Sequence, residues 1–227
     1  RRKIKTLDER NKVNTRISEL KLEALKAQLN PHFVFNAFSS IQLYILKQDT
    51  KNALEYLSKF AKLIRMTLDN STRNRIPLTE EIEFLRHYLD IEKKRVQNLD
   101  YSIHVGSNLD IETTNIPPML IQPLVENAIM HGIRHMDSNG LVKIIFSFTE
   151  NGLLRCIIED NGIGRQKASE IYSSQTRTHS SKSTLINQER IDLFNSAHKE
   201  KNIKMEYTDL CYDGVCGTRV ELIIDSN

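Results

Sequence analysis

The sequence predicts an α+β protein: an N-terminal helical bundle, then an α/β sandwich with a mixed, mostly antiparallel sheet. All eight glycines lie at or after Gly106, so the commonest turn residue is missing from the first 105 residues. Apolar residues recur at helical spacing in this first part, whereas short apolar runs and turn signals mark the second. We therefore expect two domains, residues 1–98 and residues 99–227.

The helical part begins with a seam of apolar and small residues spaced four and three apart. A second stripe of leucines beside it indicates that the helix packs against more than one partner, as in a bundle. Pro31 either kinks this helix or opens the next one. Further helices are expected over residues 33–47 and 51–68 and from Pro77 onward, where Thr79 can cap the start. The seam consists of Val13, Ile17, Leu20, Ala24 and Ala27.

The second part predicts strands over residues 101–105, 141–148, 153–159 and 217–224. Asn151-Gly152 between the second and third of these is a strong hairpin signal. Helices are expected over residues 122–131 and 190–197, and the many Ser and Thr residues of 173–184 favour a mobile loop. Helices on one face of such a sheet give a two-layer sandwich.

The composition excludes several classes of partner. The formal charge of +3 is small, and aromatic residues do not alternate with basic clusters, so we expect no nucleic-acid binding. No run of about 18 apolar residues is present. The chain starts at Arg1 rather than Met, so we expect a fragment whose upstream segment could carry a membrane span.

The three cysteines do not form a disulfide framework. Cys211 and Cys216 can approach one another across Asp213-Gly214, but their spacing is poor for metal binding and no histidine lies nearby. We expect a structural role for them in a reducing compartment.

Four segments carry candidate chemistry, and each has a plainer alternative. His32 follows Pro31 at a helix break and is a candidate nucleophile, or it is a structural histidine among Phe33, Phe35 and Phe38. In the second segment Asn127 and His131 share a helix face beside Glu126. The amide oxygen of Asn127 suits Mg²⁺, and His131 can reach a phosphate. The plainer alternative is that these residues form the polar face of an amphipathic helix.

The remaining two segments are rich in glycine. Glu159-Asp160 ends a strand before Gly162-Ile163-Gly164, where glycine admits a close ligand and Asp160 can accept a hydrogen bond from an amine such as that of adenine. This motif can equally be a simple turn. Gly217-Thr218 can pass close to a nucleotide or merely start a strand.

Together and in this order, the four segments resemble the LytS-like subfamily of sensor histidine kinases. Residues 28–36 (QLNPHFVFN) resemble its phosphoacceptor motif, residues 123–132 its N box, and residues 159–164 and 217–222 its glycine boxes. Residues 58–65 and 81–89 resemble its dimerisation helices. The resemblance implies a dimeric helical bundle followed by a Bergerat-type ATP-binding (GHKL) fold.

The resemblance also implies roles. His32 would be the phosphoacceptor, Glu126 a catalytic polar group and Asn127 the ligand of Mg²⁺. Asp160 would read adenine, and residues 173–190 would form a lid over ATP. The implied ATP-binding set is Asn127, His131, Gly132, Asp160, Gly162, Gly164, Ser181, Arg190, Gly217 and Thr218.

The resemblance implies an ATP-dependent protein-histidine kinase of a two-component system that passes phosphate from His32 to an aspartate of a response-regulator receiver domain. The chain would be a homodimer and the cytoplasmic fragment of a bacterial inner-membrane sensor. One departure is that the lid has no glycine near Ser183. This departure keeps a non-catalytic signalling adaptor open as an alternative, and an ATPase of the same fold without phosphohistidine is another.

Overall fold

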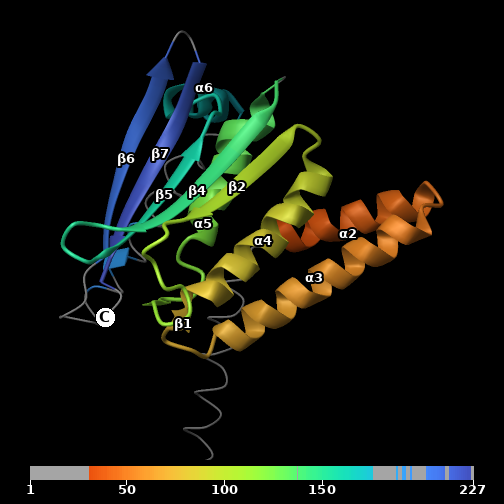
Figure 1. Ribbon diagram of the computed structural model, residues 1–227. Helices are drawn as coiled ribbons and strands as arrows, with labels where there is room; N and C mark the ends of the chain where they lie inside the picture. The colour runs from red at the N-terminus through yellow and green to blue at the C-terminus, as the bar shows by residue number, and fades with distance from the viewer. Residues whose placement is uncertain are drawn as a thin grey trace, which may run out of the picture. The chain divides into compact units, whose positions relative to one another are not determined.

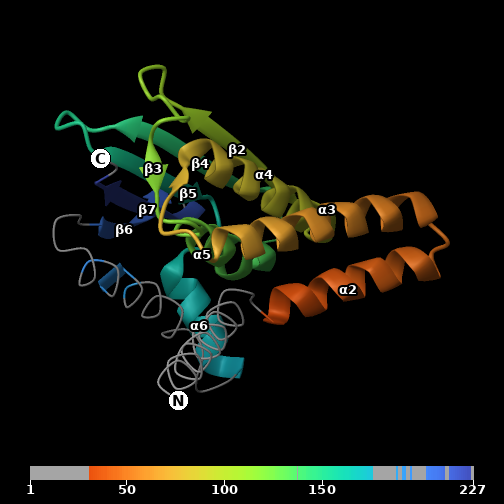
Figure 2. The ribbon, with the colours of Figure 1, turned by 90° about the horizontal axis from the view of Figure 1, so that it is seen from below.

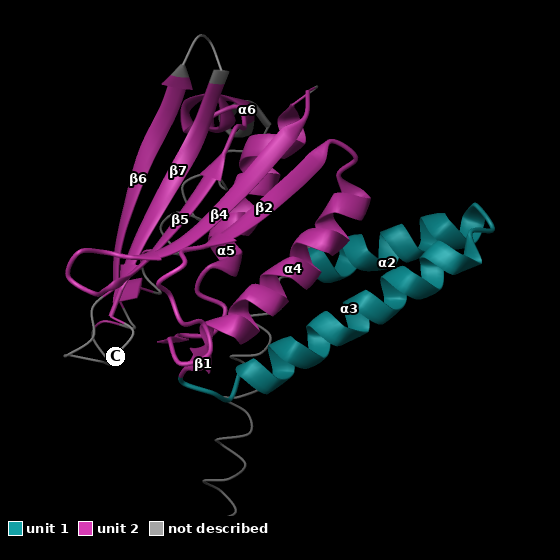
Figure 3. Ribbon diagram, viewed as in Figure 1, with its two compact units in different colours: residues 1–74 teal, residues 75–227 magenta. Residues whose placement is uncertain are grey.

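A computed structural model describes residues 31–136, 138–175, 188, 191–192, 195, 203–212 and 215–225. It divides into two compact units, Arg1–Asn74 and Arg75–Asn227 (Figure 3). The predicted seam from Val13 to Ala27 lies outside the described residues, so the two alternatives for Pro31 stay open.

The first unit contains a hairpin of two helices, α2 (Pro31–Leu46) and α3 (Thr50–Asn70), as the sequence predicted. The Asp49 side chain caps α3 by accepting a hydrogen bond from the backbone N–H of Asn52 at 3.2 Å. Phe33 and Phe38 of α2 each pack on the ring of Phe60, with centroids 5.9 and 6.0 Å apart. Aromatic packing of this kind joins the two helices.

A second apolar face of the hairpin is exposed. The spacing of Leu54, Leu57 and Phe60 predicts that they share one helix face, but these leucines are 62% and 45% exposed, because α2 covers the opposite side of α3. Phe35 is 72% and Leu46 81% exposed on α2. Soluble monomers rarely leave so many large apolar side chains uncovered on one pair of helices.

The second unit is built on a five-stranded sheet (Figure 1). Its strands are β2 (Leu99–Val105), β4 (Gly140–Phe148), β5 (Leu154–Asp160), β7 (Val215–Ile224) and β6 (Ile203–Tyr212), in that spatial order. Only the β2–β4 pair is parallel, and the other three pairs are antiparallel. The predicted mixed, mostly antiparallel sheet is therefore confirmed. A separate small ladder pairs β1 (Ile76–Pro77) with β3 (Asn115–Ile116).

The helices α4 (Leu78–Arg95), α5 (Gln122–Asn127) and α6 (Arg165–Gln175) lie on one side of this sheet (Figure 2). Alternate strand residues point to this side and are buried, as period-two patterning requires. They include Val142, Ile144, Phe146, Leu154, Cys156, Ile158, Val220, Leu222 and Ile224. The other face carries half-exposed ion pairs, Arg155 with Glu221 at 2.8 Å and Arg219 with Glu159 at 2.6 Å. The sheet thus forms a two-layer sandwich, which is the predicted fold class.

The structure differs from the sequence predictions at several points. No side chain caps α4, which starts at Leu78 after Pro77, so the predicted cap by Thr79 is wrong. The compact units divide after Asn74, because α4 packs with β2 and β1, and the domain boundary after residue 98 stays a prediction. Helix α6 extends to Gln175 into the predicted loop, and the rest of that loop to residue 184 lies outside the described residues.

Other segments agree where they are described. Ile191, Asp192 and Asn195 are helical within the predicted helix 190–197. The hairpin between β4 and β5 turns at Gly152, whose φ of 74° lies in the left-handed region that glycine favours. Among the helices that the structure describes, none combines the length and apolar character needed to cross a lipid bilayer.

Candidate functional site

Asp160 is the centre of the site. It is the last residue of β5, and the strand alternation points it to the helix-covered face, where it is 7% exposed. The backbone N–H of Gly162 donates to its Oδ1 at 2.8 Å. Burial raises the pKa of Asp160 to about 6, and the hydrogen bonds from the backbone N–H groups of Gly162 and Thr218 oppose this rise. The carboxylate is therefore mostly ionised at pH 7, in a site that stays poorly solvated.

Three glycines pack directly around Asp160. A Cβ on Gly132 would lie 2.8 Å from Asp160 Oδ1. A Cβ on Gly162 would overlap the backbone of Gly132, and one on Gly217 would overlap the carbonyl oxygen of Asp160. A side chain at Gly132 would displace the Asp160 carboxylate, and one at Gly162 or Gly217 would require a shift of the backbone. The N box and both glycine boxes, which lie far apart in the sequence, thus meet at one carboxylate.

Gly164 completes this wall. Its φ is 77°, a conformation that L side chains rarely adopt. A Cβ there would lie 3.0 Å from the Cβ of Cys216, which immediately precedes Gly217. The turn after β5 and the start of β7 therefore fit closely against each other.

The helix predicted over residues 122–131 is α-helical only in its first part. α5 ends at Asn127 and continues as a π-helical turn, η1 (Ala128–Gly132), and then as a 3₁₀ turn, η2 (Ile133–His135). A π-helical turn of this kind is often found at functional sites. The turn contacts β5 and β7 and ends at Gly132, whose backbone leaves no room for a side chain on Gly162. It brings the end of the N box onto the Asp160 cluster.

The polar side chains of the N box are half-buried. Glu126 and Asn127 end α5, and His131 lies in the π-helical turn. Burial lowers the pKa of His131, with a further lowering from His135. This lowering of the pKa favours the neutral imidazole of His131, which can donate a hydrogen bond to a phosphate oxygen.

Two supports of the N box are residues that the sequence did not single out. Glu81 of α4 is fully buried, and its carboxylate accepts the backbone N–H of Met119 at 3.0 Å and that of Ile121 at 3.4 Å. Met119 has a φ of 56°, so this carboxylate holds an unusual backbone segment directly before α5. The sequence could have predicted the burial of Glu81, since Glu81 lies four residues before Leu85 on the apolar stripe of α4.

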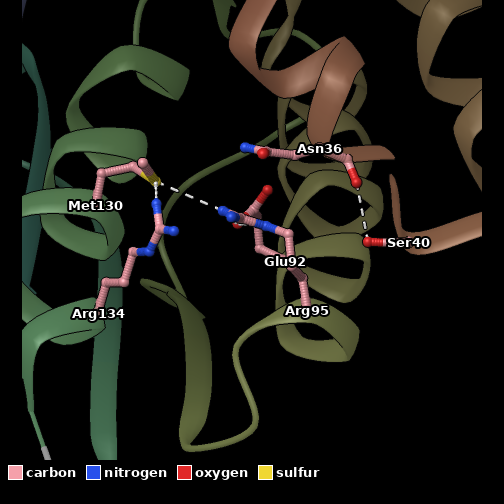
Figure 4. A network of polar contacts seen from close by, with 6 residues as sticks. All are labelled: Asn36, Ser40, Glu92, Arg95, Met130 and Arg134. Carbon is pink, nitrogen blue, oxygen red and sulfur yellow. Dashed lines mark hydrogen bonds and ion pairs between the residues drawn. The ribbon is translucent and has the colours of Figure 1, made fainter. Parts of the chain in front are cut away.

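The second support is a polar network between α4 and the π-helical turn (Figure 4). Arg95 pairs with the buried carboxylate of Glu92 and donates to Met130 Sδ at 3.5 Å. Arg134 donates to the same sulfur at 3.9 Å. Burial raises the pKa of Glu92, and Arg95 offsets part of that rise. Figure 4 also shows a contact within α2, from Ser40 Oγ to the carbonyl oxygen of Asn36 at 3.0 Å.

The structure brings together some predicted site residues and not others. Gly132, Asp160, Gly162, Gly217 and the backbone of Thr218 form one cluster. Ser181 and Arg190 lie outside the described residues. His32 is the second residue of α2 in the other unit, and its side chain also lies outside what the structure describes.

The donor set of the N box fits Mg²⁺ held together with phosphates. The described residues contain no group of three or more His, Cys, Asp or Glu side chains arranged to hold a metal by themselves. Mg²⁺ at a nucleotide site needs only one or two protein oxygens, because phosphates and water supply the others. The half-buried Glu126 and Asn127 at the end of α5 offer such oxygens.

Comparisons with known proteins identify relatives of this chain. A family model described as histidine kinase matches residues 20–99. The sensor protein LytS of Oceanobacillus iheyensis is 37% identical over 158 residues, which are 69% of this chain and 26% of that protein. LytS of Enterococcus faecalis is 29% identical over 168 residues, 74% of this chain and 28% of that protein.

A solved structure is also similar. The histidine kinase domain of the blue-light activated kinase EL346 of Erythrobacter litoralis is 14% identical, with a TM-score of 0.47, and the match covers 92% of this chain and 96% of that one. The chain spans about a quarter of the length of the two LytS proteins. From the family model and these LytS relatives, the chain belongs to the histidine kinase family, among the LytS-like sensor proteins.

Proposed function

We propose that this chain is the ATP-dependent kinase core of a two-component sensor, which phosphorylates its own His32 and passes the phosphate to an aspartate of a response regulator. The observation that carries the proposal is the cluster in which Gly132, Gly162 and Gly217 close around the buried Asp160. Three sequence motifs separated by up to 85 positions meet there. Their meeting is expected if all three contact one bound nucleotide.

Asp160 suits recognition of adenine. Its carboxylate is ionised at pH 7, since its pKa is about 6, and it can accept a hydrogen bond from an exocyclic amine. The low exposure of the group strengthens such a bond and penalises a base that offers an acceptor instead. The glycines let the backbones of the three motifs pack against Asp160 and against one another, and a flat ring would lie beside this carboxylate.

The N box would hold the phosphates. The amide oxygen of Asn127, with the carboxylate of Glu126 beside it, would bind Mg²⁺, and a neutral His131 would donate to a phosphate oxygen. Mg²⁺, when bound with ATP, neutralises charge on the phosphate oxygens. Glu81 and the Glu92–Arg95 pair hold this segment in place from α4. Ser181 and Arg190 would contribute from the lid.

The chemical step is an in-line attack by an imidazole nitrogen of His32 on the γ-phosphorus. A nitrogen–phosphorus bond forms while the bond to the leaving oxygen of ADP breaks, and positioning supplies most of the catalysis. The product phosphohistidine is the donor for the aspartate of the receiver domain.

The exposed apolar face of the helical hairpin supports a homodimer. Leu54 and Leu57 of α3 and Phe35 and Leu46 of α2 would be covered by the same face of a second copy, as in a four-helix bundle. We also propose that the chain is the cytoplasmic part of a bacterial inner-membrane sensor, with the membrane reached only through an upstream segment. Its match to about a quarter of the length of LytS proteins supports this.

The test is incubation of the purified chain with γ-labelled ATP and Mg²⁺. We expect an acid-labile, alkali-stable label that is lost in His32→Gln and in Asn127→Ala. His104→Gln is the matched control, because His104 is exposed on β2 and should leave the label unchanged. Label that persists in His32→Gln contradicts the phosphoacceptor role. Nucleotide binding without any label would favour a signalling adaptor.

A further inference from the structure

Two cysteines face each other on the β6–β7 hairpin. Cys211 and Cys216 are directly paired in the antiparallel register, and their Sγ atoms lie 2.6 Å apart. Both are free thiols, with Cys211 exposed and Cys216 half-buried. Directly opposite residues of antiparallel strands have Cα atoms about 4.5–5.5 Å apart. This separation lies within the range of disulfides, about 4.4–6.8 Å, so the paired strands allow a disulfide between the two cysteines without backbone movement.

The surroundings favour dithiol chemistry over metal binding. Within the described residues, no group of metal-ligating side chains includes these thiols. The nearest acidic residue along β6, Asp209, is engaged by the guanidinium of Arg165 at 2.7 and 2.9 Å. The described contact of each Sγ atom is therefore with the Sγ atom of the other cysteine.

The pair also adjoins the Asp160 cluster. Cys216 precedes Gly217, and its Cβ would lie 3.0 Å from a Cβ on Gly164. Gly217 itself packs against the carbonyl oxygen of Asp160. A covalent link between Cys211 and Cys216 would thus fix the strand end that forms one wall of the cluster.

We propose that Cys211 and Cys216 form a reversible redox site, which a low-molecular-weight disulfide oxidises to an intramolecular cross-strand disulfide. The thiolate of the exposed Cys211 attacks one sulfur of the small disulfide, which gives a mixed disulfide and releases one small thiol. The thiolate of Cys216 then attacks Cys211 Sγ and releases the second small thiol. The protein pair loses two electrons, the small disulfide gains them, and the two protons pass to the leaving thiols.

The first test uses the whole chain in its folded state with oxidised glutathione as the probe. We expect a mass lower by two hydrogen atoms and a crosslinked pair of peptides containing Cys211 and Cys216, both reversed by dithiothreitol. The buried Cys156 should stay a thiol and serves as the internal control. The Cys211→Ser variant should lose the crosslink. A stable glutathione adduct, a crosslink between two chains, or oxidation only in denaturant would overturn the proposal.

A second measurement asks whether the bond changes the neighbouring cluster, and this part rests on the proposed function. The affinity for a fluorescent ATP analogue is compared between the reduced and oxidised chain, with the Cys211→Ser, Cys216→Ser double variant treated identically. A severalfold difference seen only in the wild-type chain supports coupling, and equal affinities refute coupling. Failure of the analogue to bind in both states would contradict the proposed function and leave the oxidation result intact.

Discussion

Replacement of Glu81 by alanine tests whether a buried carboxylate holds the segment that leads into the N box. Glu81 is fully buried and accepts the N–H of Met119 at 3.0 Å and, more weakly, that of Ile121 at 3.4 Å. In Glu81→Ala both donors lose this acceptor within a dry interior. An unsatisfied buried group costs about 1–3 kcal/mol, so we expect a loss of about 2–5 kcal/mol in the free energy of unfolding.

The assay is urea denaturation followed by circular dichroism, together with amide hydrogen exchange over residues 119–121. A local loss of 2 kcal/mol would speed exchange there by about thirtyfold, since 1.4 kcal/mol is about tenfold. Glu83→Ala is the matched control, because Glu83 is half-exposed on the same helix and its substitution should cost less than about 0.5 kcal/mol. Glu81→Gln keeps one acceptor oxygen, so its loss of stability should lie between those of Glu81→Ala and Glu83→Ala.

Equal unfolding midpoints for Glu81→Ala and Glu83→Ala would refute this reasoning. So would a loss of stability without faster exchange at residues 119–121, because the cost would then arise from the cavity and not from the released N–H groups. Met119 lies in the left-handed region at a φ of 56°, so release should let this segment relax to an ordinary conformation. We expect weaker ATP-analogue binding as a consequence.

Three further predictions follow from the same geometry. The pKa of Asp160 is raised to about 6, so the folded state binds its proton more tightly than the unfolded state, and the free energy of unfolding should fall by about 3 kcal/mol in all as pH rises from about 3 to about 7. Urea titrations should show a smaller pH dependence in Asp160→Asn, and analogue affinity should rise with pH only in the wild type. Gly217→Ala should lower the free energy of unfolding by about 1–3 kcal/mol or more, because the added methyl group overpacks against Asp160, and it should abolish analogue binding. The control Gly152→Ala has open space around it and only an unfavourable φ, so it should lower the free energy of unfolding by about 1 kcal/mol and leave analogue binding intact. Leu57→Glu should shift the chain from dimer to monomer in analytical ultracentrifugation without unfolding α3, and a dimer that persists would contradict the proposed interface.

Much of the fold followed from local patterns. The helices α2, α3 and α4 and the strands β2, β4, β5 and β7 lie within a few residues of the predicted ranges. Apolar periodicity reports which face of an element is buried, and Asn151-Gly152 specifies its own turn. Helix α6 and strand β6 were not predicted, because α6 has little apolar periodicity and β6 carries Lys204, Glu206 and Asp209 at an exposed edge.

The candidate site was predictable as a set of motifs but not as an arrangement. The sequence singled out Asp160 and the glycines, because these residue types in these strings resemble a known family. It did not single out Glu81, Glu92 or Arg95, whose importance lies in contacts across the fold. The structural role of a buried carboxylate can be assigned only when its hydrogen-bond donors are known.

The sequence by itself determined the α+β class, most of the elements and the family, since these depend on residue spacing and on short strings. The tertiary structure decided that Gly132, Gly162 and Gly217 meet at Asp160, that α5 widens into a π-helical turn, and that Cys211 faces Cys216. The physical reason is that these features depend on strand register and close packing between distant segments. Such contacts are set by the fit of whole elements, which no local pattern contains.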